Sequence, residues 1–127
     1  MFRRIITVLA MASTTVLLAA GAAHAADTWV YTASPAEYHG YASWTEDGDT
    51  LTVCDNNADG WGTRGYIYVP NQPNPANGTV LIKGNDPNAT DGCYSYSENI
   101  SETTALSIKV CLYSGALVGY CDYRRIR

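Results

Sequence analysis

The pattern that most constrains this chain is a succession of short strand-like segments with almost no helix signal between them. β-Branched and aromatic residues gather in segments of five to nine residues, and clusters of Gly, Pro, Asn and Asp separate one segment from the next. Many short strands at nearly even spacing predict an all-β fold, a small antiparallel β-sandwich or barrel of about 7–8 short strands. The expected strands are residues 28–32, 37–45, 50–54, 65–69, 79–83, 93–97, 105–113 and 117–123.

Local patterns support antiparallel pairing. In residues 105–113, apolar side chains occupy every second position, as in a strand with one buried face. "EDGDT" at 46–50 places Asp-Gly between two expected strands, which favours a hairpin turn. The short "SGA" at 114–116 predicts a second hairpin, between residues 105–113 and 117–123.

The N-terminus has the three-part layout of a secretory signal peptide. Arg3 and Arg4 precede an apolar run, and the small-x-small sequence "AHA" ends at Ala25. We therefore expect residues 1–25 to be removed and the protein to be secreted and extracellular. The rest divides into an N-terminal arm or first strand, residues 26–36, and a secreted β domain, residues 37–127.

The charge balance of residues 26–127 limits the partners. Without Arg3 and Arg4, six basic side chains stand against twelve acidic ones, a net charge of −6. A domain this acidic is a poor candidate for binding nucleic acid or an anionic membrane. "RRIR" at 124–127 holds three of the six positive charges, and it is either a solvated tail or a docking point for an acidic partner.

The cysteines predict two disulfides. An even number in an exported domain is typical of a disulfide framework, and the wide spacing disfavours a metal site. Four cysteines allow three connectivities, but the predicted hairpin of residues 105–123 brings its two cysteines together. We therefore expect the pairs Cys111–Cys121 and Cys54–Cys93.

"VCDNNADGWGTRGYIYV", residues 53–69, begins like a calcium-binding loop. Oxygen ligands and a glycine at the spacing of the front half are supplied by Asp55, Asn57, Asp59 and Gly60. The twelfth position should be a bidentate Glu but is Tyr66, and the flanking segments are expected strands. We therefore expect a turn capped by its own Asn and Asp side chains and no metal cofactor, and weak calcium binding stays open.

Catalytic patterns are scarce. His39 is the one histidine after the leader, it falls in an expected strand, and no glycine–serine nucleophile elbow accompanies it. A pair of carboxylates for glycoside cleavage stays open, although most of the acids lie in expected turns. We expect a protein that is not an enzyme and has no catalytic residues, with His39 as the candidate should an activity exist.

The aromatic residues favour a binding protein. The chain has ten Tyr and three Trp, and its single Phe lies in the leader. Tyr and Trp provide large, stiff contact surfaces and are common in binding sites. We expect a secreted non-enzymatic protein-binding module. The alternatives are an inhibitor of an extracellular hydrolase, presenting "PNQPNPANG" at 70–78, or a carbohydrate-binding protein that stacks Trp44 or Trp61 on sugar rings.

Two long stretches carry a family resemblance. "EYHGYASWTEDGDTLTVCDNNADGWGTRGYIYV" at 37–69 and "SIKVCLYSGALVGYC" at 107–121 resemble small secreted actinobacterial proteins with two disulfides and a β-sandwich fold. One branch that looks similar is the adaptor subunit of the umbrella toxin particles of streptomycetes. The resemblance covers about residues 37 to 123, and its motifs are moderately specific.

The resemblance implies partners and a contact segment. In those particles the adaptor joins a lectin subunit to a large repeat toxin, so secreted protein partners of these kinds are expected, with no nucleic acid and no membrane. The adaptor inserts an extended N-terminal segment into a cleft of the lectin, and the matching stretch here is residues 26–37. Trp29 and Tyr31 would be its partner-binding residues, unless this stretch is an ordinary first strand.

Overall fold

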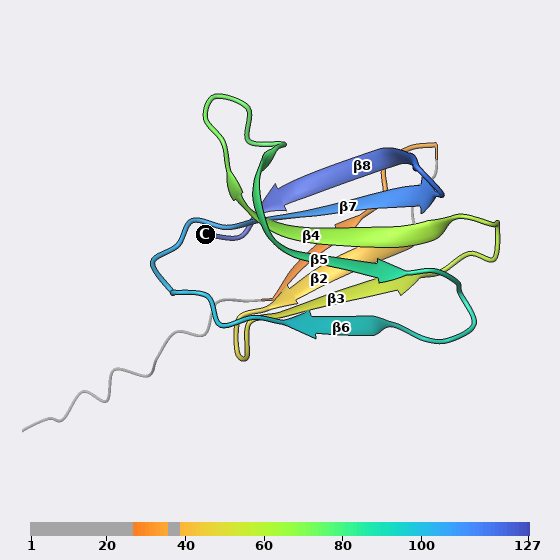
Figure 1. Ribbon diagram of the computed structural model, residues 1–127, viewed down its shortest axis with the longest axis horizontal. Coiled ribbons are helices and arrows are strands. Elements are labelled where there is room, and N and C mark those ends of the chain that lie inside the picture. Colours follow the sequence, from red (N-terminus) through yellow and green to blue (C-terminus); the bar gives the residue numbers. More distant parts are fainter. Residues whose placement is uncertain (1–26, 36–38) are drawn as a thin grey trace, which may run out of the picture.

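A computed structural model describes residues 27–35 and 39–127 of the chain. Within these residues it contains eight strands in two antiparallel sheets packed face to face, and no helix (Figure 1). The first sheet has the order β1-β2-β3-β6 and the second β5-β4-β7-β8. The strands are β1 (Thr28–Tyr31), β2 (Gly40–Thr45), β3 (Thr50–Asp55), β4 (Gly62–Pro70), β5 (Gly78–Asp86), β6 (Tyr94–Ser97), β7 (Ser107–Ser114) and β8 (Leu117–Arg125).

The predicted all-β sandwich is confirmed, and each expected strand overlaps an observed one. The boundaries differ by up to three residues, and β4, for example, begins three residues before the predicted segment 65–69 and so includes Arg64. Within the described residues, no helix is long and apolar enough to cross a membrane. The predicted signal peptide, residues 1–25, lies outside the described residues, as do residues 26 and 36–38.

The core fills the space between the sheets, and strand alternation decides which residues enter it. Apolar side chains from six strands are buried there, among them Val30, Trp44, Leu51, Ile67, Ile82, Ile108 and Val110. Gly65 marks a close approach of the sheets, because a Cβ atom added to it would lie 2.7 Å from Val53 Cγ2. Trp44 is fully buried, so its proposed sugar-stacking role is wrong. The alternation of β2 turns Trp44 inward along with Ala42.

Both predicted disulfides are present. Cys54 at the end of β3 is bonded to Cys93 just before β6, with their Cα atoms 4.4 Å apart. Cys111 of β7 is bonded to Cys121 of β8, with a Cα separation of 4.1 Å, and the strand register shifts between Val110 and Leu112. Two disulfides are typical of a protein that folds in an oxidising, extracellular setting.

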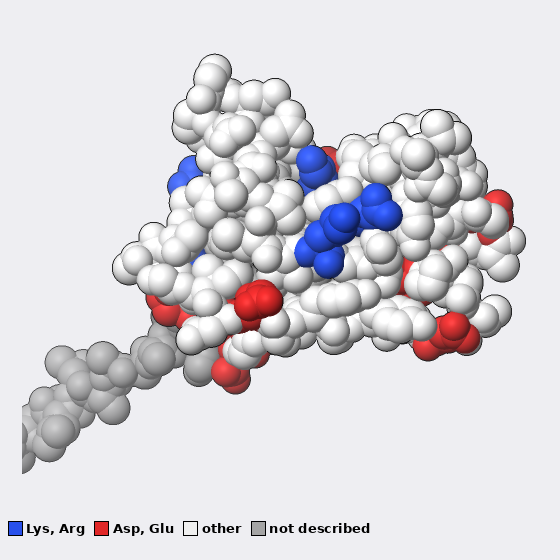
Figure 2. Space-filling view, viewed as in Figure 1, with Lys and Arg blue, Asp and Glu red and all other residues white. Residues whose placement is uncertain are grey.

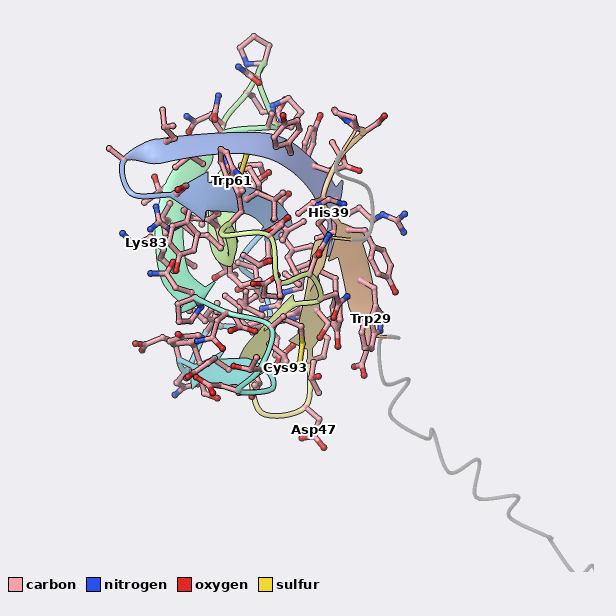
Figure 3. All side chains as sticks on the ribbon, turned by 90° about the vertical axis from the view of Figure 1, so that its right-hand side faces the viewer. Trp29, His39, Asp47, Trp61, Lys83 and Cys93 are labelled. Carbon is pink, nitrogen blue, oxygen red and sulfur yellow. A yellow bond between two sulfur atoms is a disulfide. The ribbon has the colours of Figure 1, made fainter. Side chains whose placement is uncertain are left out.

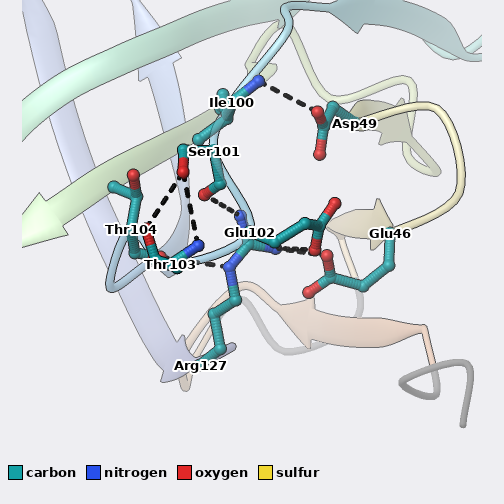
Figure 4. Close-up of polar contacts among 8 residues, drawn as sticks. All are labelled: Glu46, Asp49, Ile100, Ser101, Glu102, Thr103, Thr104 and Arg127. Atoms are coloured by element: carbon teal, nitrogen blue, oxygen red, sulfur yellow. Dashed lines mark hydrogen bonds and ion pairs between the residues drawn. The ribbon is translucent and has the colours of Figure 1, made fainter.

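The "RRIR" segment is ordered and does not form a solvated tail. Its first two residues complete β8, and the backbone of Leu106 donates to the carbonyl of Arg127 at 3.0 Å. The Arg127 guanidinium bonds the Glu46 carboxylate and donates to the carbonyls of Ser101 and Thr104, each at 3.0 Å (Figure 4). This contact holds the end of the chain against the β2–β3 turn and the loop after β6.

Candidate functional site

Three aromatic residues, two exposed and one half-buried, form a cluster on the outer face of the sheet β1-β2-β3-β6. The ring centroid of Tyr41 lies 5.1 Å from that of Trp29 and 5.6 Å from that of Tyr31. Trp29 keeps 45% of its surface exposed and Tyr31 keeps 38%. We call these three residues the aromatic cluster.

The strand register explains why these rings point outward together. Val30 is buried in the core, so its neighbours Trp29 and Tyr31 project from the opposite face of β1. Tyr31 lies directly opposite Tyr41 of β2. Both predicted partner-binding residues therefore lie in an ordinary first strand of the sheet. This was the alternative to an extended segment that inserts into a partner.

The rest of this outer face is polar and without charge. The outward positions of the four strands hold the aromatic cluster, the Cys54–Cys93 disulfide and the hydroxyl residues Ser43, Thr45, Thr50, Thr52, Ser95 and Ser97. Hydroxyls pair across the strands, Thr50 with Ser97 at 2.9 Å and Thr52 with Ser95 at 3.1 Å. We call this surface the uncharged face.

The outer face of the other sheet, β5-β4-β7-β8, has the opposite character. Its outward positions hold four basic residues, Arg64, Lys83, Lys109 and Arg125, and four tyrosines, of which Tyr123 is exposed, Tyr66 and Tyr113 are half-buried and Tyr68 is buried. The cations lie over the rings, with Arg64 Cζ 4.3 Å from the Tyr113 centroid and Lys109 Nζ 5.3 Å from that of Tyr66. We call this surface the basic face, and Figure 3 shows Lys83 and Trp29 on opposite sides of the molecule.

A hollow of about 260 Å³ lies beside His39 at one end of the sandwich. His39 precedes β2 and does not lie within a strand, and its Nδ1 is 3.0 Å from Asp59 Oδ2. The described residues that line the hollow are Pro35, His39, Asp59, Trp61, Leu112 and Tyr120. None of these carries a hydroxyl or thiol suited to a nucleophile activated by His39, apart from the weakly nucleophilic phenol of Tyr120. Trp61 packs edge-on against Tyr120, with ring centroids 6.1 Å apart.

The calcium-like segment forms a self-capped turn, as the sequence predicts. Asp55 Oδ1 accepts a hydrogen bond from the backbone N–H of Asn57 at 3.1 Å, and Asp59 Oδ1 accepts one from that of Trp61 at 2.9 Å. Gly60 has a φ of +82°, which favours glycine. These bonds occupy the Oδ1 atoms of both aspartates, and Asp59 Oδ2 contacts His39 Nδ1.

One of these aspartates is buried. Asp55 is 7% exposed, and its Oδ2 atom is buried without a hydrogen-bond partner among the described residues. Burial raises the pKa of the Asp55 carboxyl above its ordinary value, the N–H of Asn57 opposes that rise, and the negative charges of Asp59 and Asp86 add to it. Burial of this carboxylate in the folded state therefore costs solvation free energy.

Carboxylate oxygens of Glu46, Asp49 and Glu102 lie within 4.8 Å of one another. The Arg127 guanidinium bonds Glu46 and lies 3.7 Å from Glu102, so the protein supplies its own cation here (Figure 4). Asp49 also accepts the backbone N–H of Ile100 at 2.9 Å. These contacts connect the β2–β3 turn, the loop after β6 and the segment after β8.

Comparisons of the chain with protein-family models, with curated proteins and with solved structures find no match. The two outer faces are therefore the main evidence for function. The sequence analysis named Trp29 and Tyr31 through the family resemblance, and it did not predict the basic face, because the net charge of −6 describes the domain as a whole. The available signal was the alternation in "RGYIY", residues 64–68, which places Arg64, Tyr66 and Tyr68 on one side of a strand.

Proposed function

We propose that this protein is a secreted, non-enzymatic protein-binding module and that the aromatic cluster is its contact surface. The observation that carries the proposal is a group of three aromatic rings, two of them exposed, on a sheet face whose described strand positions hold no charged side chain. The centres of protein interfaces are enriched in Tyr and Trp and depleted of charged residues. Exposed aromatic anchors of this kind often supply most of the binding energy.

The position of the cluster also favours a protein partner. β1 is the outermost strand of its sheet, so a partner can approach Trp29 and Tyr31 from the front and from the side. Outer strands are common docking sites for extended segments of other proteins. The three rings are tilted to one another, by 34° for Trp29–Tyr41 and 48° for Tyr31–Tyr41, which suits an irregular surface better than a flat one.

Within this class we propose the role of an adaptor in an extracellular toxin particle. The expected partners are a lectin-like subunit and a large repeat toxin. Support comes from the resemblance in residues 37–69 and 107–121 and from the presence of two outer faces with different chemistry. An adaptor needs two separate contact surfaces, and the uncharged and basic faces lie on opposite sides of the sandwich (Figure 3).

The test is an affinity capture with point variants. Residues 26–127 carry a C-terminal tag, are secreted from an actinobacterial host, and are recovered from the supernatant with their bound chains, which mass spectrometry identifies. The double variant Trp29→Ser, Tyr31→Ser should lose the partner. Substitutions serve better than deletion of the segment, because Val30 between them is a core residue.

A matched control is available at the β7–β8 turn. Leu117 is 66% exposed and lies opposite Ser114, so Leu117→Ser removes exposed apolar surface away from the aromatic cluster. This control should recover the same chains as the wild type. Equal recovery of partners by the aromatic-cluster variant and the wild type would contradict the proposal. If the wild type binds glycans on an array and the aromatic-cluster variant does not, the cluster is a carbohydrate-binding site instead.

One observation favours hydrolase inhibition as a second candidate function. The loop between β4 and β5 projects from the sandwich (Figure 1), and hydrogen bonds within the loop and to Tyr68 hold it. Asn71 N–H donates to the Asn77 carbonyl and the Tyr68 hydroxyl to that of Pro75, each at 2.8 Å. A loop held in one conformation loses little entropy on binding. The test is a panel of secreted proteases and glycosidases. Inhibition of one of them that is abolished by replacing Gln72 and Asn74 would support this function, and the absence of inhibition across the panel would exclude it.

A further inference from the structure

Charge is strongly segregated in this acidic domain. Four of the six basic residues after the leader lie on the basic face, and the outward positions of its four strands hold no Asp or Glu. Figure 2 shows Lys and Arg side chains gathered in the middle of this side of the molecule, with Asp and Glu towards its margins. The domain is negative overall, but one of its faces is positively charged.

The positive residues are arranged in rows across the sheet. Lys83 of β5 and Lys109 of β7 both lie opposite Tyr66 of β4, and Lys109 lies opposite Tyr123 of β8. Since adjacent strands are about 4.8 Å apart, the two lysine positions are separated by about 10 Å. Arg64 lies two residues from Tyr66 on β4 and completes a triangle of cations around one tyrosine.

The cations of this face have no acidic partners in the described part of the chain. The ion pairs found there involve His39 and Arg127 only. Arg64 Nε donates to Asn85 Oδ1 at 2.7 Å and Lys109 Nζ to the Ala76 carbonyl at 3.2 Å, so neutral groups orient both side chains. Lys83 is exposed and makes no side-chain hydrogen bond with a described residue. The positive charges are thus available to an anion from outside.

The surroundings favour a short anionic segment over a long polyanion. Asp86 of β5 and Asp122 of β8 lie opposite the inward-facing Thr63 and Val110, Asp91 lies in the loop after β5, and the whole domain is negative. A nucleic acid or another extended polyanion would meet this repulsion along its length. A segment with a few carboxylates can contact the cations alone, and the exposed ring of Tyr123 and the half-buried ring of Tyr66 add apolar contact area.

We propose that the basic face binds an acidic, extended segment of a secreted protein partner. This inference rests on the proposed function, because it assigns the second contact surface of a module that joins secreted proteins. Arg64, Lys83 and Lys109 contact the carboxylates of that segment, and Tyr66 and Tyr123 pack against its backbone and side-chain stems.

The experiment is a fluorescence anisotropy titration of the tag-free domain, residues 26–127, with labelled peptides. The probe is an eight-residue peptide of alternating Glu and Ser, and the controls are the same peptide with Gln in place of Glu and an oligothymidine of ten nucleotides. The acidic peptide should bind in low salt and weaken by about tenfold at 0.3 M NaCl, because exposed ion pairs are screened. Lys83→Gln should weaken binding by about fivefold, as expected for one lost charge pair.

Arg124→Gln is the matched control variant. It removes the same charge from β8, at the opposite edge of the sheet, and Arg124 lies opposite the inward-facing Ile108. Binding by this variant should equal that of the wild type, and equal loss in both variants would show that only net charge matters. The proposal is also overturned if the Gln peptide binds equally, if oligothymidine binds more tightly, or if no probe binds. The aromatic-cluster variant should bind the acidic peptide normally, so failure here is distinguishable from failure of the proposed function.

Discussion

The two outer faces share a scaffold and differ in chemistry. Each covers a four-stranded sheet, includes a disulfide and presents aromatic rings, but one has no charge and the other has four cations. On the uncharged face the aromatic rings contact one another, whereas on the basic face they contact cations. The outward residues of the two sheets therefore differ in chemistry although the inward residues of both sheets form one common core.

The largest expected effect comes from the crosslinks. Replacing Cys54 and Cys93 by Ala should lower the free energy of unfolding by about 4 kcal/mol, and replacing Cys111 and Cys121 by about 3 kcal/mol, because the first pair closes the longer loop. The sequence separations are 39 and 10 residues. Urea unfolding followed by Trp fluorescence measures both values, and a greater loss from the second pair would reverse this ranking.

Lys109→Met separates the structural role of a basic-face cation from its charge. Methionine keeps an apolar stem, but it cannot donate to the Ala76 carbonyl that Lys109 Nζ reaches at 3.2 Å. We expect a loss of about 1 kcal/mol in unfolding free energy, as for one hydrogen bond. Hydrogen exchange should show faster exchange for the amide of Asn71, which donates to the Asn77 carbonyl in the same loop. Unchanged exchange would mean that the loop is braced without Lys109.

Much of this arrangement follows from local sequence. β-Branched and aromatic segments between Gly, Pro, Asn and Asp clusters located the eight strands. Period-two alternation placed Leu106, Ile108 and Val110 on one face, and each of them is fully buried in the core. The hairpin pattern also predicted the Cys111–Cys121 pair. These features depend on neighbours in sequence, so a single chain is sufficient to find them.

Features that depend on strand register could not be predicted. Alternation says which face a residue takes, but it does not say which residues of other strands lie beside it. The row containing Lys83, Tyr66 and Lys109 joins three strands, and the contact between His39 and Asp59 spans twenty residues. Trp44 was misassigned for a related reason, since an aromatic residue in a strand can face either the core or solvent.

Asp55→Asn should change stability in a pH-dependent way. Burial raises the pKa of the Asp55 carboxyl, so the folded state binds a proton more readily than the unfolded state. The stabilisation from this group is complete below the unfolded pKa of about 3.9 and is lost as pH rises through the higher folded pKa. At pH 7 the variant should be at least as stable as the wild type, and its stability should fall less between pH 4 and pH 7.

Urea midpoints at the two pH values check this prediction. Asn at this position still accepts the backbone N–H of Asn57 through its Oδ1 atom. A variant that is less stable than the wild type by the same amount at both pH values would contradict it.

The smallest effect is expected from the hydroxyl pairs of the uncharged face. Thr52→Val with Ser95→Ala removes an exposed cross-strand hydrogen bond of 3.1 Å, and Val suits a strand as well as Thr. The unfolding free energy should change by less than about 0.5 kcal/mol. Partner capture should persist as well, and loss of the partner would extend the contact surface from the aromatic cluster across to β6.

The most direct test of the account is a parallel capture with three baits: the wild type, the Trp29→Ser, Tyr31→Ser variant, and Lys83→Gln. Circular dichroism and urea midpoints first establish that all three are folded. We predict that the aromatic-cluster variant fails to recover a secreted chain that both the wild type and Lys83→Gln recover. Recovery of every wild-type partner by the aromatic-cluster variant would contradict the central claim that this cluster binds protein.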